Sequence, residues 1–152
     1  MTTVARVEPD SLYPEKELAA LVEHARGEGA VVSFVGLARD RSASGGTVVA
    51  LHLEHHPILT AKSLQEIADE AIRRFDVSHV RIVHRCGRME PGAAIVFAGA
   101  ASRHRRAAFE AADYLMDRLK TEAIFWKREE GSGESRWIEP TKADYADRNR
   151  WE

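Results

Sequence analysis

The chain has 152 residues, of which 44% are hydrophobic and 30% are charged, and its formal net charge is −2. This composition excludes a fibrous or disordered chain, and the small net charge gives no overall attraction to nucleic acids or anionic membranes. The single cysteine, Cys86, excludes an internal disulfide and a cysteine-rich metal site. The sequence has no pattern of a signal peptide, a transit peptide or a membrane span. We therefore expect one domain over residues 1–152, located in the cytoplasm.

The first part of the chain predicts a helix followed by two strands. Residues 14–26 carry apolar side chains at helical spacing, and Gly27 follows as a stop signal. Residues 29–38 form an apolar run rich in β-branched residues, which is typical of a strand covered on both faces. A flexible loop at 42–46 separates this strand from a second one at 47–55, so we expect the two to form an antiparallel pair.

The middle of the chain predicts a helix and two more strands. Residues 57–75 have the apolar spacing of an amphipathic helix. Residues 79–84 and 93–101 have the composition of strands, and a turn at 89–92 lies between them.

The last part predicts a third helix and a hairpin. The helix covers residues 102–119, with Ser102 as its expected N-cap. Strands at 124–129 and 136–138 form the hairpin, and the tail at 142–152 is expected to be helical or partly loose. The predicted fold class is α+β: a mainly antiparallel sheet with three helices packed against it, plus a C-terminal β-hairpin.

Two lysines near the end of the third helix are the most informative residues. Lys120 lies at the helix end and Lys127 lies on the next strand, where alternation places Phe125, Lys127 and Glu129 on one face. Nearby cations and partial burial both disfavour the charged ammonium, so such a pair can hold one lysine as a proton carrier or bind a phosphate or carboxylate. The alternative is that both lysines are solvated and that Glu129 forms an ordinary surface ion pair.

A compact cationic cluster, Arg103-His104-Arg105-Arg106, stands at the start of the same helix, where backbone N–H groups favour an anion. Its compactness favours a small-anion site over a nucleic-acid surface. His104 and Lys120 are separated by about 24 Å along a straight helix, too far to share one small-molecule site within one chain. If both serve one substrate, a second copy supplies one of them, which predicts a dimer with shared sites.

Three nearby histidines raise the question of a metal site. His52 and His56 share one face of their predicted strand, whereas His55 points away. Because catalytic zinc usually has three protein ligands, this spacing does not favour a metal, and we expect none. His79 and His84 also fall on opposite faces of a strand, and structural roles account for them.

A series of motifs between Gly29 and Ile138 resembles one known family. The motifs are Gly29-Ala-Val-Val-Ser-Phe-Val-Gly with Arg39, Leu53-Glu-His55, Ile82-Val-His-Arg-Cys-Gly87, Ser102-Arg-His-Arg105, Phe109-Glu-Ala111, Met116-Asp-Arg-Leu-Lys-Thr121 and Phe125-Trp-Lys-Arg-Glu129. In this order and with few gaps, they are similar to the large, catalytic subunit of molybdopterin synthase, the MoaE family.

This resemblance implies an α+β fold and a homodimer that binds two small, ubiquitin-like, MoaD-like sulfur-carrier subunits, giving a heterotetramer. Each carrier would insert a C-terminal Gly-Gly thiocarboxylate into a pocket of the large subunit. The implied reaction transfers sulfur to cyclic pyranopterin monophosphate and forms the dithiolene of molybdopterin, a step of molybdenum cofactor biosynthesis. The resemblance implies no metal or nucleotide cofactor, and we expect neither nucleic acid nor a membrane as a partner.

The resemblance also assigns roles to residues of this chain. It implies catalytic and substrate-binding roles for Lys120 and Lys127. The family's anion-binding positions match Arg39, His104 and Arg105, of which the last two come from the neighbouring chain in the family. Its pocket positions match Phe34, Met116 and Glu129. The chain departs from the family pattern at Asp40, His56 and Ile124, where asparagine, tyrosine and proline are common.

Two alternatives from other functional classes stay open. The first is a non-catalytic binding module whose basic pocket captures the acidic C-terminus of another protein. The second is a nucleic-acid binder that uses residues 103–106, and its affinity would depend steeply on salt.

Overall fold

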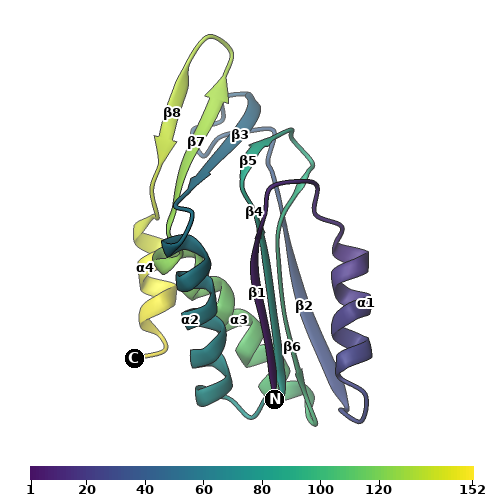
Figure 1. Ribbon diagram of the computed structural model, residues 1–152. Coiled ribbons are helices and arrows are strands. Elements are labelled where there is room, and N and C mark those ends of the chain that lie inside the picture. The colour runs from purple at the N-terminus through teal and green to yellow at the C-terminus, as the bar shows by residue number, and fades with distance from the viewer.

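The computed structural model describes all 152 residues and contains two four-stranded sheets and four helices (Figure 1). The first sheet has the order β1-β4-β6-β2, with β1 (Thr2–Glu8), β4 (His79–Arg85), β6 (Ala94–Ser102) and β2 (Ala30–Leu37). The second has the order β5-β3-β7-β8, with β5 (Gly87–Met89), β3 (Val48–His55), β7 (Phe125–Gly131) and β8 (Ser135–Ile138). The helices are α1 (Pro14–His24), α2 (Leu59–Arg74), α3 (Arg105–Glu122) and α4 (Lys142–Asn149).

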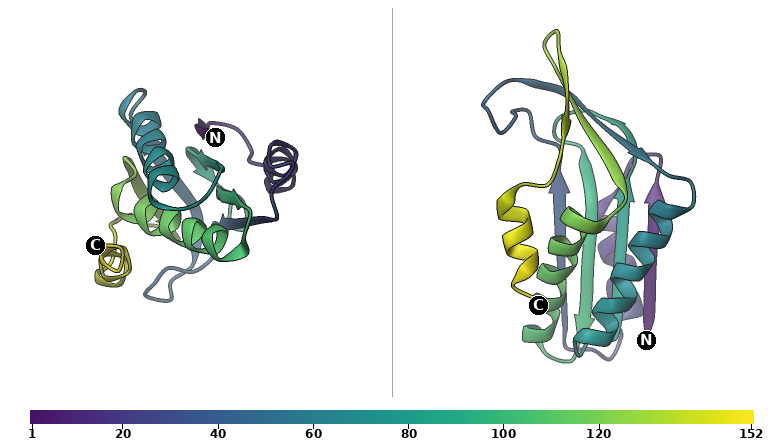
Figure 2. Two further views of the ribbon diagram at one scale, coloured as in Figure 1. Left: turned by 90° about the horizontal axis from the view of Figure 1, so that it is seen from below. Right: turned by 90° about the vertical axis from the view of Figure 1, so that its left-hand side faces the viewer.

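The helices cover both faces of the first sheet (Figures 1 and 2). Helix α1 lies on one face, and α2 and α3 lie side by side on the other. The larger apolar core fills the space between the sheet and α2 and α3, and a smaller one lies under α1. This arrangement follows from β6, which is apolar on both faces, and from β4, whose Val80 and Ile82 face the larger core while Val83 faces the smaller one.

The second sheet extends beyond one end of the first, and its β7–β8 hairpin projects furthest (Figure 1). Strand β7 starts directly after α3 and pairs with β3 on one side and β8 on the other. The short link between α3 and β7 therefore brings the end of a helix next to the centre of the second sheet.

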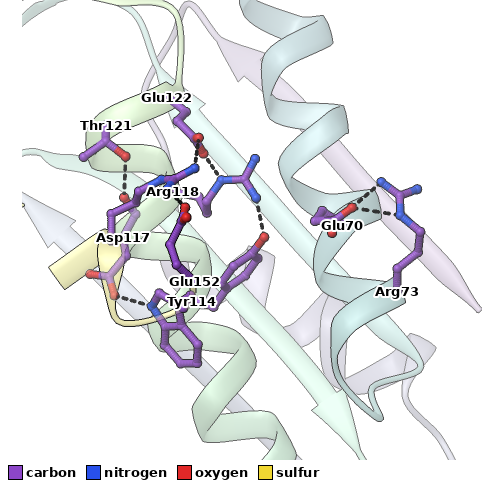
Figure 3. A network of polar contacts seen from close by, with 10 residues as sticks. Glu70, Arg73, Tyr114, Asp117, Arg118, Thr121, Glu122 and Glu152 are labelled. Atoms are coloured by element: carbon purple, nitrogen blue, oxygen red, sulfur yellow. Dashed lines mark hydrogen bonds and ion pairs between the residues drawn. The ribbon is translucent and has the colours of Figure 1, made fainter. Parts of the chain in front are cut away.

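The C-terminal tail is helical and packs against α3. Thr141 and Asp144 form a capping box at the start of α4, which accounts for an ordered helix of only eight residues. Arg148 within α4 pairs with Glu122 at 2.8 Å. After the helix, the indole N–H of Trp151 donates to Asp117 at 2.7 Å. Figure 3 shows the part of this network around Asp117, Arg118 and Glu122.

The predicted α+β class and the C-terminal hairpin are confirmed. The strands pair mainly in antiparallel fashion, with β1 and β4 as the parallel pair. The strands form two sheets instead of one, and α4 is a fourth helix. None of the helices has the length and hydropathy needed to cross a membrane.

The predicted antiparallel pairing of the strands now seen as β2 and β3 is wrong. Strand β2 pairs with β6 at the edge of the first sheet, whereas β3 lies in the second sheet between β5 and β7. The connection crosses from one sheet to the other, and only an isolated bridge between Arg41 and Thr47 resembles the expected pairing. Neighbouring strands often pair, but here β6 offers a longer apolar partner for β2.

Two local predictions also need correction. The edge position of β2 leaves Phe34 43% exposed and Leu37 57% exposed, so this strand is not covered on both faces in a single chain. Helix α3 begins at Arg105 with His104 as its N-cap, and Ser102 belongs to β6. The Ser102 hydroxyl still serves the helix start, because it accepts a hydrogen bond from the His104 backbone N–H at 3.2 Å.

Candidate functional site

Lys120 and Lys127 come from consecutive elements of the chain. Lys120 is exposed in the last turn of α3, and Lys127 is partly buried on β7. Lys127 lies opposite Leu53 of β3 and Ile138 of β8, so strands flank it on both sides. The central place of β7 in its sheet therefore explains why a lysine is held partly out of water.

The charges around Lys127 define the site. Burial, together with the positive charges of Lys120 and Arg39, lowers the pKa of Lys127 to about 8. The carboxylates of Asp144 and Glu129 act in the opposite direction. The structure thus brings together Lys120, Lys127, Arg39 and Glu129, four of the residues that the sequence predicts for the site.

Arg39, Lys120 and Lys127 form what we call the cation cluster. None of the three has an ion pair or a side-chain hydrogen bond in the structure, although arginines elsewhere in the chain are extensively paired. Three neighbouring cations without a partner repel one another, and an anion between them relieves that repulsion. The arrangement is therefore suited to binding a phosphate, a carboxylate or a thiocarboxylate.

Glu129 completes the inward face of β7. The predicted alternation holds, because Trp126 is 50% exposed on the other face of the strand. The Glu129 side chain is 12% exposed and lies 3.5 Å from the guanidinium of Arg136 on β8. This contact holds the carboxylate on the hairpin, from where it acts on Lys127 without forming a direct ion pair with it.

The other predicted pocket residues occupy different surroundings. Met116 lies one helical turn before Lys120 on α3, and its partly buried side chain packs against the larger core. Phe34 lies on the exposed edge strand β2. Arg39 follows β2 directly and lines a surface hollow together with Asp40, Arg41, Pro91 and Gly92.

His104 and Arg105 lie at the opposite end of α3 from the cation cluster. Both are exposed, and Arg105 lines a shallow groove along α3. Along α3, which starts at Arg105, His104 and Lys120 are separated by about 24 Å at ~1.5 Å per residue. One chain therefore does not bring these two residues to the cation cluster.

Two residues near Lys127 were not identified from the sequence. Asp144 is the third helical residue of α4, and its carboxylate raises the pKa of Lys127. The Thr141-x-x-Asp144 spacing signals a helix start, but not what that helix lies beside. His84 was assigned only a structural role, yet the charges of Lys127 and Lys120 both act on its buried ring.

His56, a residue of the rejected metal cluster, has a local structural role. Its Nδ1 accepts hydrogen bonds from the backbone N–H groups of Ile58 and Leu59 at 3.1 and 3.0 Å. These are orphan donors at the start of α2, so the ring substitutes for a side-chain cap.

Comparison with known proteins identifies what the chain is similar to. The family model described as "MoaE protein" matches residues 7–122, which include Lys120 and end before Lys127. The molybdopterin synthase catalytic subunit of Pseudomonas aeruginosa is 47% identical over 147 residues, covering 97% of both proteins.

Solved structures show similarity to proteins of the same family. The molybdopterin biosynthesis MoaE protein of Burkholderia ambifaria is 39% identical, with a TM-score of 0.83 over 99% of this chain and 98% of that one. A complex of subunits 1 and 2 of the molybdopterin-converting factor of Helicobacter pylori matches with a TM-score of 0.73 over 90% of this chain and 89% of that one. At 18% identity, this last likeness shows the fold alone.

Proposed function

The chain belongs to the MoaE family and is a sulfur-transfer enzyme of molybdopterin synthesis, and from this premise we propose which groups of its site perform the reaction. The substrate is cyclic pyranopterin monophosphate, and the sulfur donor is the thiocarboxylate at the C-terminal Gly-Gly of a small carrier subunit. The sulfur attacks a side-chain carbon of the pterin. A C–S bond forms while the bond between that carbon and a phosphate oxygen breaks. Water then releases the spent carrier as a carboxylate, and a second loaded carrier repeats the cycle.

The unpaired cation cluster is the observation that carries this proposal. Both reactants are anions, so the thiocarboxylate has to approach a carbon of the pterin although the charges of the two molecules repel each other. Lys120 and Lys127 hold the thiocarboxylate and stabilise the charge that develops on the leaving oxygen. Arg39 binds the phosphate, for which a planar guanidinium is well suited.

Lys127 is also suited to move a proton. With a pKa of about 8, it is present in both the charged and the neutral form near neutral pH. The efficiency of a general acid or base is highest when its pKa lies near the working pH. Lys127 can therefore give a proton to the departing oxygen and recover one from water in the hydrolytic step.

The length of α3 supports a site shared between two copies of the chain. His104 and Arg105 are exposed and lie too far from Lys120 along one helix to act with it. In a homodimer, these residues reach the cation cluster of the partner copy and hold the substrate phosphate there. Phe34 and Leu37, both exposed on the edge strand β2, supply apolar surface for such an interface.

The carrier subunit reaches the site from outside the dimer. The solved structure of the Helicobacter pylori protein is a complex of subunits 1 and 2, which supports a second type of chain in this assembly. We place Phe34, Met116 and Glu129 along the pocket that receives the carrier's tail. The reaction takes place in the cytoplasm, where the single cysteine, Cys86, stays reduced.

A reconstitution experiment tests this function. The purified chain is mixed with a thiocarboxylated carrier and the cyclic pterin, and dithiolene formation is measured after oxidation of the product to a fluorescent pterin. We expect product only when all three components are present. A stable complex with the carrier but no dithiolene would identify a binding module instead. Tight, salt-sensitive binding of DNA or RNA without turnover would favour the nucleic-acid alternative.

A further inference from the structure

His84 is the only buried histidine of the chain, with 9% of its surface exposed. It lies near the end of β4, and its ring stacks on Phe125 of β7 at 4.1 Å between ring centroids and 26° between the ring planes. Phe125 and Lys127 are two residues apart on the same face of β7. His84 therefore contacts the strand that carries Lys127, on the side to which Lys127 points.

The hydrogen bonding of His84 fixes its tautomer. Nδ1 lies 2.9 Å from the backbone carbonyl oxygen of Arg85, and since a carbonyl only accepts, Nδ1 carries the hydrogen. The other nitrogen, Nε2, then has a free lone pair, and the chain offers it no hydrogen-bond partner. Nε2 is not one of the fully buried side-chain atoms that lack a hydrogen-bond partner, so it borders accessible space from which a donor can reach it.

The ring stays uncharged near neutral pH. Burial, together with the charges of Lys127 from β7 and Lys120 from α3, lowers the pKa of His84 to about 4, although the Arg85 carbonyl acts in the opposite direction. No charged group of β1, β6 or α2 affects its pKa. A neutral acceptor beside two ammonium groups can take a hydrogen bond from either without adding to their repulsion.

We propose that His84 is a positioning residue for Lys127: the stack on Phe125 fixes the strand, and Nε2 accepts a hydrogen bond from the Lys127 ammonium when the site is occupied. The flexible four-carbon chain of Lys127 allows its ammonium to reach that nitrogen. Lys120 comes from the end of a helix and is exposed, whereas Lys127 is partly buried on the strand whose Phe125 stacks on His84, so Lys127 is the better donor for this ring. This inference rests on the catalytic role proposed above for Lys127.

Two substitutions separate the stack from the hydrogen bond. His84→Phe keeps an aromatic ring against Phe125 but removes both nitrogens, whereas His84→Gln keeps a polar acceptor and removes the stack. His79→Phe is the matched control, because His79 lies at the opposite end of β4 and on its other face. The pKa of Lys127 is measured in each protein with inorganic phosphate present as the occupant of the cation cluster, from the pH dependence of lysine acylation followed by peptide mass spectrometry.

We expect His84→Phe to lower the pKa of Lys127 by about one unit, since a hydrogen bond that favours the ammonium is lost. His84→Gln and His79→Phe should leave this pKa close to that of the unmodified chain. In turnover assays, kcat of His84→Phe should fall by roughly tenfold or more with little change in KM, as for a misplaced catalytic group.

An unchanged pKa of Lys127 in a folded His84→Phe protein would overturn the inference, and so would equal shifts in His84→Phe and His79→Phe. If His84→Phe does not fold, His84→Asn replaces it. This variant retains an acceptor, so the pKa of Lys127 should stay unchanged. A shift of one unit in His84→Asn would count against the inference. Because the titration needs no substrate, it is independent of the proposed reaction. Normal turnover by Lys127→Ala would remove the catalytic role of Lys127, whatever the titration shows.

Discussion

The hydroxyl of Thr60 on α2 donates a hydrogen bond to the backbone carbonyl oxygen of Ile124 at 2.6 Å. The backbone N–H of Ile124 in turn donates to the Ser63 hydroxyl at 3.1 Å. Ile124 lies in the short link between α3 and β7, so both of its backbone polar groups are tied to α2. These two hydrogen bonds fix the position of Lys127 relative to Lys120. The second bond is possible because residue 124 is not the proline common in the family, since proline has no N–H.

Replacing Thr60 tests this link. Thr60 is fully buried, and its hydroxyl also accepts a hydrogen bond from the His56 backbone N–H at 2.8 Å. Thr60→Val leaves two partly buried backbone groups without these partners, so we expect the free energy of unfolding to fall by roughly 2 kcal/mol. Urea denaturation measures the change, with the exposed Thr47→Val as a control. A loss under about 0.5 kcal/mol would show that these bonds do not hold the link.

Lys120→Ala should abolish dithiolene formation while leaving the fold intact. Lys120 is exposed and unpaired, so its removal should change the free energy of unfolding by less than about 0.5 kcal/mol. Loss of a group that stabilises charge in the transition state should lower turnover by roughly 10² or more. Lys62→Ala, an equally exposed lysine on α2, is the matched control in the same reconstituted assay. Turnover within a few-fold of the unmodified enzyme would remove Lys120 from the mechanism.

Lys127→Met should lower activity but raise stability. The pKa of Lys127 is about 8 in the folded chain against an ordinary value of 10.5, so the unfolded chain binds more protons between these two pH values. Stability therefore rises with pH across that window, and below about pH 8 the buried ammonium destabilises the fold to its full extent. At pH 7 we expect the substitution to add roughly 1 kcal/mol, allowing for partial exposure.

The stabilisation by Lys127→Met should shrink as the pH rises from 8 through 10.5, because above 10.5 the lysine is mostly neutral in both states. Denaturation at pH 7 and pH 10 provides the comparison, and Lys120→Met is the exposed control. A gain that is equal at both pH values would mean that the added methionine packing, and not relief of a buried charge, is responsible.

Mixing two inactive variants tests the shared site. If His104 serves the partner's cation cluster, His104→Ala and Lys120→Ala damage opposite parts of the same composite site. A dimer containing one chain of each type then has one intact site and one doubly damaged site. After random subunit exchange we expect about a quarter of the unmodified activity, because half of the dimers are mixed and each has one working site. Activity no higher than that of the separate variants would show that the residues do not combine across an interface.

Much of the fold could be predicted because local patterns dominate it. The helices α1 and α2 and the β7–β8 hairpin have clear periodicity and turn residues, and all three appear where they were expected. The pairing of β2 and β3 failed because the choice of strand partners depends on which apolar surfaces meet in space. Residues 29–38 are apolar enough to be covered on both faces, yet β2 is an edge strand with Phe34 exposed.

The candidate site was only partly accessible from the sequence. Lys120, Lys127 and Glu129 lie close together along the chain, so helix and strand geometry were enough to group them. Arg39 joined them through the resemblance to a family, and its positive charge helps to lower the pKa of Lys127. His84 and Asp144 were missed because they reach Lys127 from β4 and α4, and no local pattern reports that proximity.

The attachment of the C-terminal residues to α3 has a practical consequence for work with this protein. The helix that carries Lys120 also carries Asp117 and Glu122, to which Trp151 and Arg148 are bonded. These bonds hold Asp144 in place, and Asp144 helps to keep Lys127 charged. An affinity tag added after Glu152, or a truncation of the last few residues, would therefore alter the charge balance of the site itself. Protein for kinetic work should carry its tag at the N-terminus, where β1 begins at the far end of the first sheet from the hairpin (Figure 1).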